Sequence, residues 1–105
     1  MLSASLNKNT YEQYETAEVN YLIAYSGSNT TVHLTAYCDN EKISEQYASV
    51  SYNINHIWNV LLSQAGIWTF IVAIEDYNLS QTISNIIVNE QEIELPEIDI
   101  EDNSL

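Results

Sequence analysis

The stretch AGIWTFIVAIEDYNLSQTISNIIV, residues 65–88, constrains the fold of this chain more than any other. From Ile67 onward its side chains fall into two alternating sets, Trp68, Phe70, Val72 and Ile74 on one face and Ile67, Thr69, Ile71 and Ala73 on the other. A period of two residues is that of a β-strand, whereas a helix repeats every 3.6 residues. The pattern therefore predicts a strand that buries Trp68 and Phe70, a hairpin turn at EDYN and a return strand over residues 79–88.

Further short strands are predicted upstream, separated by turn residues such as Gly27 and the pair Asp39–Asn40. They cover residues 2–6, 17–25, 30–38 and 54–63. The third of them alternates cleanly, which predicts that it buries Val32, Leu34, Ala36 and Cys38.

Two segments between these strands have weaker patterns. We expect residues 41–53 to form a short edge strand and a crossing loop, and the polar residues 7–16 to offer nothing to bury. A helix is the alternative over residues 54–63, because that segment does not alternate strictly.

The length of 105 residues allows one compact domain and a tail. About seven strands with turns every 8 to 12 residues, and a single proline at position 96, are typical of an antiparallel β-sandwich. We therefore predict an all-β fold, with a sandwich domain over residues 1–88 and an acidic C-terminal tail over residues 89–105.

The charge of the chain excludes some classes of partner. Fifteen Asp and Glu residues stand against two Lys and no Arg, for a net charge of −13. Binding to nucleic acid or to an anionic membrane needs clustered positive charge, so we expect neither. A protein with a neutral or basic surface is the expected partner.

Seven of the fifteen carboxylates fall in the last 16 residues, where acidic and aliphatic residues alternate. We expect this tail to dock on a partner as an extended strand whose aliphatic side chains enter pockets. These side chains are Ile93, Leu95, Ile98 and Ile100. The alternative is a tail that only keeps the protein soluble.

The stretch of residues 65–88 resembles the last two strands of bacterial immunoglobulin-like modules of the polycystic-kidney-disease and fibronectin types. The residues in register with their common pattern are Ala65, Gly66, Trp68, Phe70, Val72, Ile74 and Asp76. The resemblance places Trp68 where these folds have their tyrosine corner, and Phe70 near the second antibody cysteine. It implies an immunoglobulin-like sandwich.

Residues capable of chemistry are few and scattered. His33 and His56 lack further ligands at metal spacing, and the single Cys38 is expected to be a buried core residue. Carboxylates at Asp39 and Glu41, and at Glu75 and Asp76, are candidates for Ca²⁺, although Asp76 is more simply explained as a turn residue. We expect no catalytic residues, no metal and no cofactor, and hence a protein that is not an enzyme.

Among the eight tyrosines, three lie where exposure would require a partner to explain it. Tyr11 and Tyr14 are in the polar segment and Tyr77 is at the predicted hairpin tip. We expect these three to contact a partner protein or a carbohydrate, because Tyr offers contact area at low entropic cost.

Two functions are consistent with these features. The first is a structural accessory protein, like the immunoglobulin-like auxiliary or decoration proteins of phage capsids, which assemble in the host cytoplasm and reside on the virion surface. The absence of a secretory signal at residues 1–15 favours it, with the major capsid protein as the expected partner. The alternative is an adhesion or spacer module that forms part of a longer protein on the bacterial cell surface and binds carbohydrate or protein.

Overall fold

Strand β7 (Gly66–Ile74) lies at the centre of the larger of two β-sheets. The computed structural model describes residues 1–27 and 29–91. Its larger sheet has five strands in the order β2-β8-β7-β4-β5, and its smaller sheet has three in the order β1-β3-β6. Across the described ranges the only helix is the single 3-10 turn η1 (Glu75–Tyr77). The prediction of an all-β chain with two sheets is confirmed.

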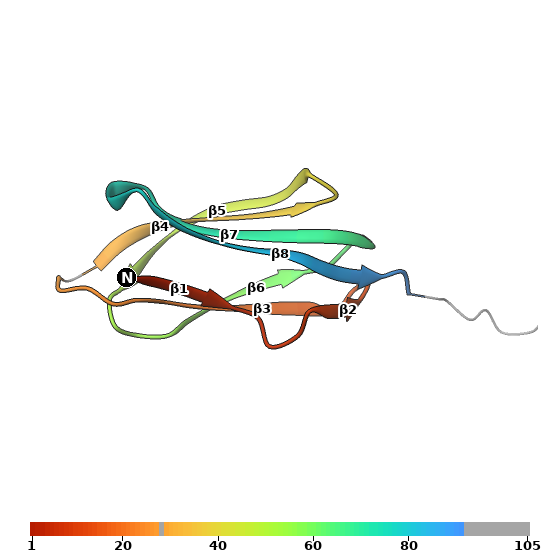
Figure 1. Cartoon of the computed structure of the whole chain (residues 1–105), viewed down its shortest axis with the longest axis horizontal. Helices are drawn as coiled ribbons and strands as arrows, with labels where there is room; N and C mark the ends of the chain where they lie inside the picture. The colour runs from red at the N-terminus through yellow and green to blue at the C-terminus, as the bar shows by residue number, and fades with distance from the viewer. Residues whose placement is uncertain (28, 92–105) are drawn as a thin grey trace, which may run out of the picture.

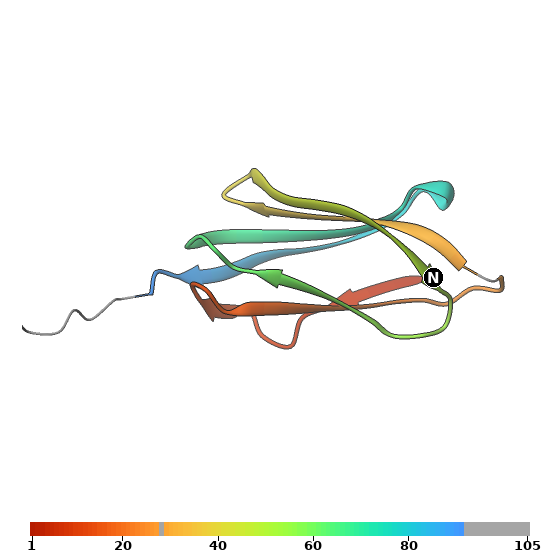
Figure 2. The same cartoon turned by 180° about the vertical axis from the view of Figure 1, so that it is seen from behind.

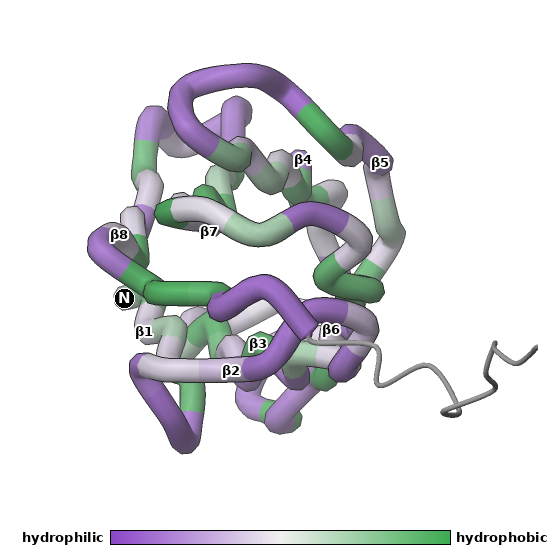
Figure 3. Tube along the Cα trace, turned by 90° about the vertical axis from the view of Figure 1, so that its right-hand side faces the viewer, coloured by the Kyte–Doolittle hydropathy of each residue, from purple (hydrophilic) through white to green (hydrophobic). Residues whose placement is uncertain are grey.

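The two sheets form two layers (Figure 1), and a view along the molecule shows the trace of one layer above that of the other (Figure 3). The smaller sheet consists of β1 (Leu2–Ser5), β3 (Thr16–Ile23) and β6 (His56–Leu61). The larger sheet joins β7 to β2 (Thr10–Glu12), β4 (Asn29–Cys38), β5 (Glu41–Ser51) and β8 (Leu79–Asn89).

The core between the layers is built on the alternation of β7. Trp68, Phe70, Val72 and Ile74 are all fully buried, as predicted. The ring of Phe70 meets Trp58 of β6 edge to face, with 6.0 Å between ring centroids, so the two sheets are joined through aromatic packing. The indole Nε1 of Trp68 donates a hydrogen bond of 2.9 Å to the carbonyl of Gln64, which satisfies its buried polar group.

The segment 7–16 differs from its prediction. It contains β2, which pairs with β8 in parallel, so the sheet is not purely antiparallel. Hydrogen bonds at both ends hold it there, from Ile87 N to the Asn9 carbonyl at 3.0 Å and from Gln13 N to the Asn89 carbonyl at 2.8 Å. The sequence gives little sign of this strand, because it is three residues long and only its middle residue is buried.

The two weakly patterned segments between β4 and β7 are both strands. β5 is an eleven-residue edge strand, longer than the predicted short strand and loop, and it remains mostly exposed because nothing covers its outer edge in the described residues. β6 buries Trp58 and Val60 in alternation, so the helical alternative for residues 54–63 is wrong. β8 runs one residue past the predicted domain limit at position 88.

The central position of Phe70 leads to a test by mutation. Phe70→Ala should lower the free energy of unfolding by about 3–5 kcal/mol, because it leaves a cavity between the sheets. Ile67→Ala on the exposed face of the same strand is the matched control and should change it by less than about 1 kcal/mol. Urea unfolding measures both. A small effect at Phe70 would mean that the ring does not carry the inter-sheet packing.

Candidate functional site

Three chain connections meet at one end of the sandwich, and each carries a tyrosine. They are the segment after β3, the connection from β5 to β6, and the turn η1 between β7 and β8, which lie together at the left of Figure 1. Their tyrosines are Tyr25, Tyr52 and Tyr77. We call this group the tyrosine tip. It forms because these strands of both sheets end on the same side of the core.

The three rings of the tyrosine tip are in direct contact. Tyr25 packs against Tyr52 edge on, with 5.4 Å between ring centroids, and against Tyr77 at 5.1 Å with a tilt of 46°. Tyr52 is buried, whereas Tyr25 and Tyr77 remain 51% and 44% exposed. The tip therefore presents two aromatic rings to solvent on a buried aromatic base.

Backbone contacts hold the segment after β3 in place. The side chain of Asn53 accepts a hydrogen bond from Tyr25 N at 3.3 Å and donates one to the Tyr25 carbonyl at 2.9 Å. Gly27 has φ of +147°, and a Cβ at that position would lie 2.7 Å from the ring of Tyr52. A glycine is thus required where this segment crosses the tyrosine base.

The turn that carries Tyr77 is anchored to the larger sheet through His33. The His33 ring stacks on Tyr47 with 4.4 Å between centroids. Its Nδ1 lies 3.2 Å from a carboxylate oxygen of Glu75, and its Nε2 lies 2.6 Å from one of Glu45. A protonated imidazole can donate to both carboxylates and so link the turn to β5. Beside it is a pocket of about 200 Å³, lined by Thr31, His33, Tyr47, Glu75 and Asp76.

Hydrogen bonding also changes the acidity of the Tyr77 hydroxyl in the tyrosine tip. The hydroxyls of Tyr52 and Tyr77 are 3.3 Å apart and share a hydrogen bond. This bond, with partial loss of solvent as a lesser cause, raises the pKa of Tyr77 to about 12. The fold therefore favours the neutral phenol of Tyr77.

The raised pKa predicts how the tip responds to alkaline pH. The contribution of Tyr77 to stability should be complete below its ordinary pKa of about 10 and lost as the pH rises through about 12. At about pH 11 the ring carbons of Tyr77 should give the NMR shifts of a neutral phenol in the wild type, and those of a phenolate in Tyr52→Phe. Tyr14→Phe should leave the titration of Tyr77 unchanged. An unaltered titration in Tyr52→Phe would show that the hydroxyl pair is not the cause.

Of the three tyrosines expected at the surface, only two are exposed, and they lie apart. Tyr77 belongs to the tyrosine tip. Tyr14 is exposed at the opposite end of β6, where its backbone N–H donates to the carbonyl of Leu62. Tyr11 is only 3% exposed, so the expectation that it lies at the surface is wrong.

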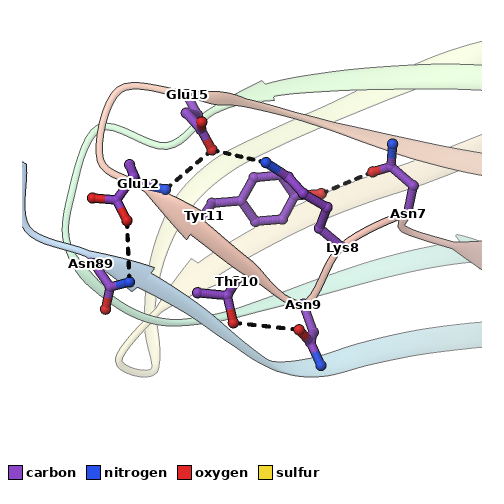
Figure 4. Close-up of polar contacts among 8 residues, drawn as sticks. All are labelled: Asn7, Lys8, Asn9, Thr10, Tyr11, Glu12, Glu15 and Asn89. Carbon is purple, nitrogen blue, oxygen red and sulfur yellow. Dashed lines mark hydrogen bonds and ion pairs between the residues drawn. The ribbon is translucent and has the colours of Figure 1, made fainter.

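Figure 4 shows why Tyr11 is covered. Its hydroxyl lies 3.4 Å from the side-chain oxygen of Asn7, and the ammonium group of Lys8 lies 4.5 Å from the centre of its ring. Lys8 is also paired with Glu15 at 3.2 Å. A shallow hollow of about 370 Å³ lies over this group, but its one cation is already held by the ring and the carboxylate. The remaining expected contacts, Ile93, Leu95, Ile98 and Ile100, lie outside the described residues.

The groups considered for metal binding or catalysis are separated by the fold. His33 is in the larger sheet and His56 in the smaller one, where its ring bonds the carbonyl of Ser51 at 2.9 Å. Cys38 is buried as predicted, and its burial is the main reason that the pKa of its thiol is raised. Asp39 accepts a hydrogen bond from Ile67 N. No cluster of three or more His, Cys, Asp or Glu side chains within residues 1–27 and 29–91 is arranged to hold a metal ion.

Tyr25 and Tyr52 were missed by the sequence reasoning, although a signal for them exists. The three connections read AYSGSN, SYNIN and EDYN, so Tyr recurs with Asn at all three turns, with Ser at two of them and with Gly at one. This composition is that of binding loops in antibodies, where Tyr supplies contact area and the small polar residues adapt. The pattern is visible only when the three turns are compared with one another.

Comparisons with known proteins add no relative. No model of a known protein family matches the chain, and neither the curated proteins nor the solved structures give a match. In the part of the chain that the structure describes, no helix has the length and apolar character needed to cross a membrane.

Proposed function

We propose that the two-sheet fold is an immunoglobulin-like sandwich. The five-stranded and three-stranded sheets, with β2 beside β8 and β6 at the edge of the smaller sheet, support this assignment. A second support is the bond from Trp68 Nε1 to the carbonyl four residues earlier. In immunoglobulin-like folds the tyrosine-corner hydroxyl bonds the backbone a few residues upstream in a comparable way.

We propose further that the chain is a non-enzymatic binding module, and that the tyrosine tip is its contact surface. The observation that carries this proposal is that three connections bring three tyrosines into contact and leave two rings exposed. The rings are held in place before binding by Asn53, Gly27 and Tyr52, so little side-chain entropy remains to be lost when a partner binds.

The charge of the molecule indicates the kind of partner. A net charge of −13 favours a neutral or basic protein surface and opposes another acidic one. Glu75 and Asp76 lie beside Tyr77 on the turn, so the tip itself offers carboxylates to a basic partner. The acidic segment 92–105, outside the described residues, is proposed as a second contact that steers association through its charge.

The setting that we propose is an accessory subunit on a large assembly such as a phage capsid, on the virion surface. The resemblance of residues 65–88 to immunoglobulin-like modules supports this setting. The tyrosine tip also supports it, because a contact surface of this kind requires no catalytic residues. The alternative is an adhesion module of a bacterial surface protein that binds carbohydrate. Exposed tyrosine rings beside Asn and Asp side chains favour it, because they supply apolar faces and hydrogen-bonding groups in one place.

The proposal predicts that loss of the two exposed rings weakens binding with little loss of stability. Tyr25→Ser combined with Tyr77→Ser should weaken binding to the assembly about 30-fold or more, as expected for aromatic residues at the centre of an interface. Tyr14→Ser, an exposed tyrosine at the other end, is the control and should bind like the wild type. Co-sedimentation with particles from the source cells measures binding to a capsid. A glycan array measures binding to carbohydrate, which the alternative function requires.

Urea unfolding of the same variants separates binding from folding. Neither exposed ring should contribute more than about 1 kcal/mol to the free energy of unfolding. If the double variant binds as well as the wild type to particles and to glycans, the tyrosine tip is not the contact surface.

A further inference from the structure

Strand β6 has one edge to which no described strand is bonded. It is the last strand of the smaller sheet and pairs only with β3 within the described residues (Figure 2). Leu62 N donates to the carbonyl of Glu15, and Ala24 N donates to the carbonyl of Met1 on the far side of β3. Backbone groups in an antiparallel strand point alternately to one neighbour and the other. The N–H and C=O groups of Ile57, Asn59 and Leu61 therefore face the open edge.

The other three sheet edges carry features that hinder strand addition. β1 has four residues, and β2 has three with Lys8, Glu12 and Glu15 around it. β5 is long but carries Glu41, Lys42 and Glu45. Short length and charged side chains are the usual protection of an edge against pairing. β6 has neither a charged residue nor a proline, and its ladder with β3 has no bulge.

The side chains next to the open edge are apolar. Ile57 and Leu61 are 54% and 58% exposed on the outer face of β6, with Asn59 between them. The strand belongs to residues 46–74, which contain no Asp, Glu, Lys or Arg although the whole chain has a net charge of −13. The charge is thus kept away from this one edge.

A second copy of the chain is the occupant that fits this distribution of charge. Two copies repel each other over most of their surface, but an uncharged edge can face its own copy without placing like charges together. The residue opposite Asn59 on β3 is Glu18, which carries a carboxylate. In a paired sheet the two Glu18 residues would be three strand spacings apart, about 14 Å, which exceeds the Debye length of about 8 Å at physiological ionic strength.

We propose that β6 pairs antiparallel with β6 of a second copy about a two-fold axis at Asn59, and so forms a symmetric dimer with one continuous six-stranded sheet. In this register the outward backbone groups of Asn59 bond those of Asn59 of the second copy, and Ile57 lies beside Leu61 of the second copy on the outer face. The pairing does not involve the tyrosine tip. It places the two tips at opposite ends of the dimer, so the proposal stands independently of what the tip binds.

Sedimentation equilibrium of the full chain between about 1 μM and about 1 mM tests the dimer. The expected result is a mass that rises from monomer to dimer with concentration. Added NaCl should strengthen the dimer, because salt screens the repulsion between two acidic molecules and the interface itself has no ion pairs. Backbone amides of Ile57 and Asn59 should gain protection from hydrogen exchange at the higher concentration. A monomer mass throughout would overturn the proposal.

Two variants test whether the open edge of β6 forms the dimer interface. Asn59→Glu places two carboxylates together at the axis and should raise the dissociation constant of the dimer at least about tenfold. Asn59→Pro removes an N–H that faces the open edge and should have a similar effect, while leaving the pairing with β3 intact. Ser49→Glu adds the same charge at an exposed position on β5 and is the matched control, which should dimerise like the wild type.

Thermal unfolding followed by circular dichroism checks that each variant is folded. If Asn59→Pro does not fold, Ile57→Ser combined with Leu61→Ser replaces it, since both side chains are exposed and their loss should weaken the dimer only. A dimer that persists unchanged in the folded variants would show that the two copies meet elsewhere.

Discussion

The edge-to-face contact between Trp58 and Phe70 is the interaction on which the rest of the structure depends. It joins the centre of the larger sheet to the edge strand of the smaller one, in a chain whose single cysteine allows no internal disulfide. Aromatic side chains bury 150–250 Å² each. Shifting β7 by one residue would turn Trp68 and Phe70 to solvent, so this packing fixes the register of the central strand.

The tyrosine tip and the open edge of β6 are both consequences of that packing. Packing of the two sheets brings the connections after β3, β5 and β7 to the same end of the sandwich. Their tyrosines are therefore in contact there. The same arrangement leaves β6 with β3 on one side only. Both proposed contact surfaces are thus positioned by the core.

The sequence predicted the buried face of each well-patterned strand, and it placed Tyr77 at an exposed hairpin tip. It failed where the local pattern was weak. Tyr11 sits among polar residues, yet its ring is covered through contacts with Asn7 and Lys8, and its strand is held by a backbone more than 70 residues away. Tyr25 and Tyr52 looked like ordinary turn residues, because their importance lies in their contact with each other and with Tyr77.

What the sequence by itself determined is therefore where the well-patterned strands lie and which face of them is buried, because a period of two records burial directly. Beyond the predicted hairpin of β7 and β8, the tertiary structure alone decided which strands are neighbours, that β2 runs parallel to β8, and which three turns share one end of the molecule. The physical reason is that backbone hydrogen bonds are the same for any pair of strands. The choice of neighbour comes from packing between residues far apart in the chain, such as Trp58 with Phe70, and no local pattern contains it.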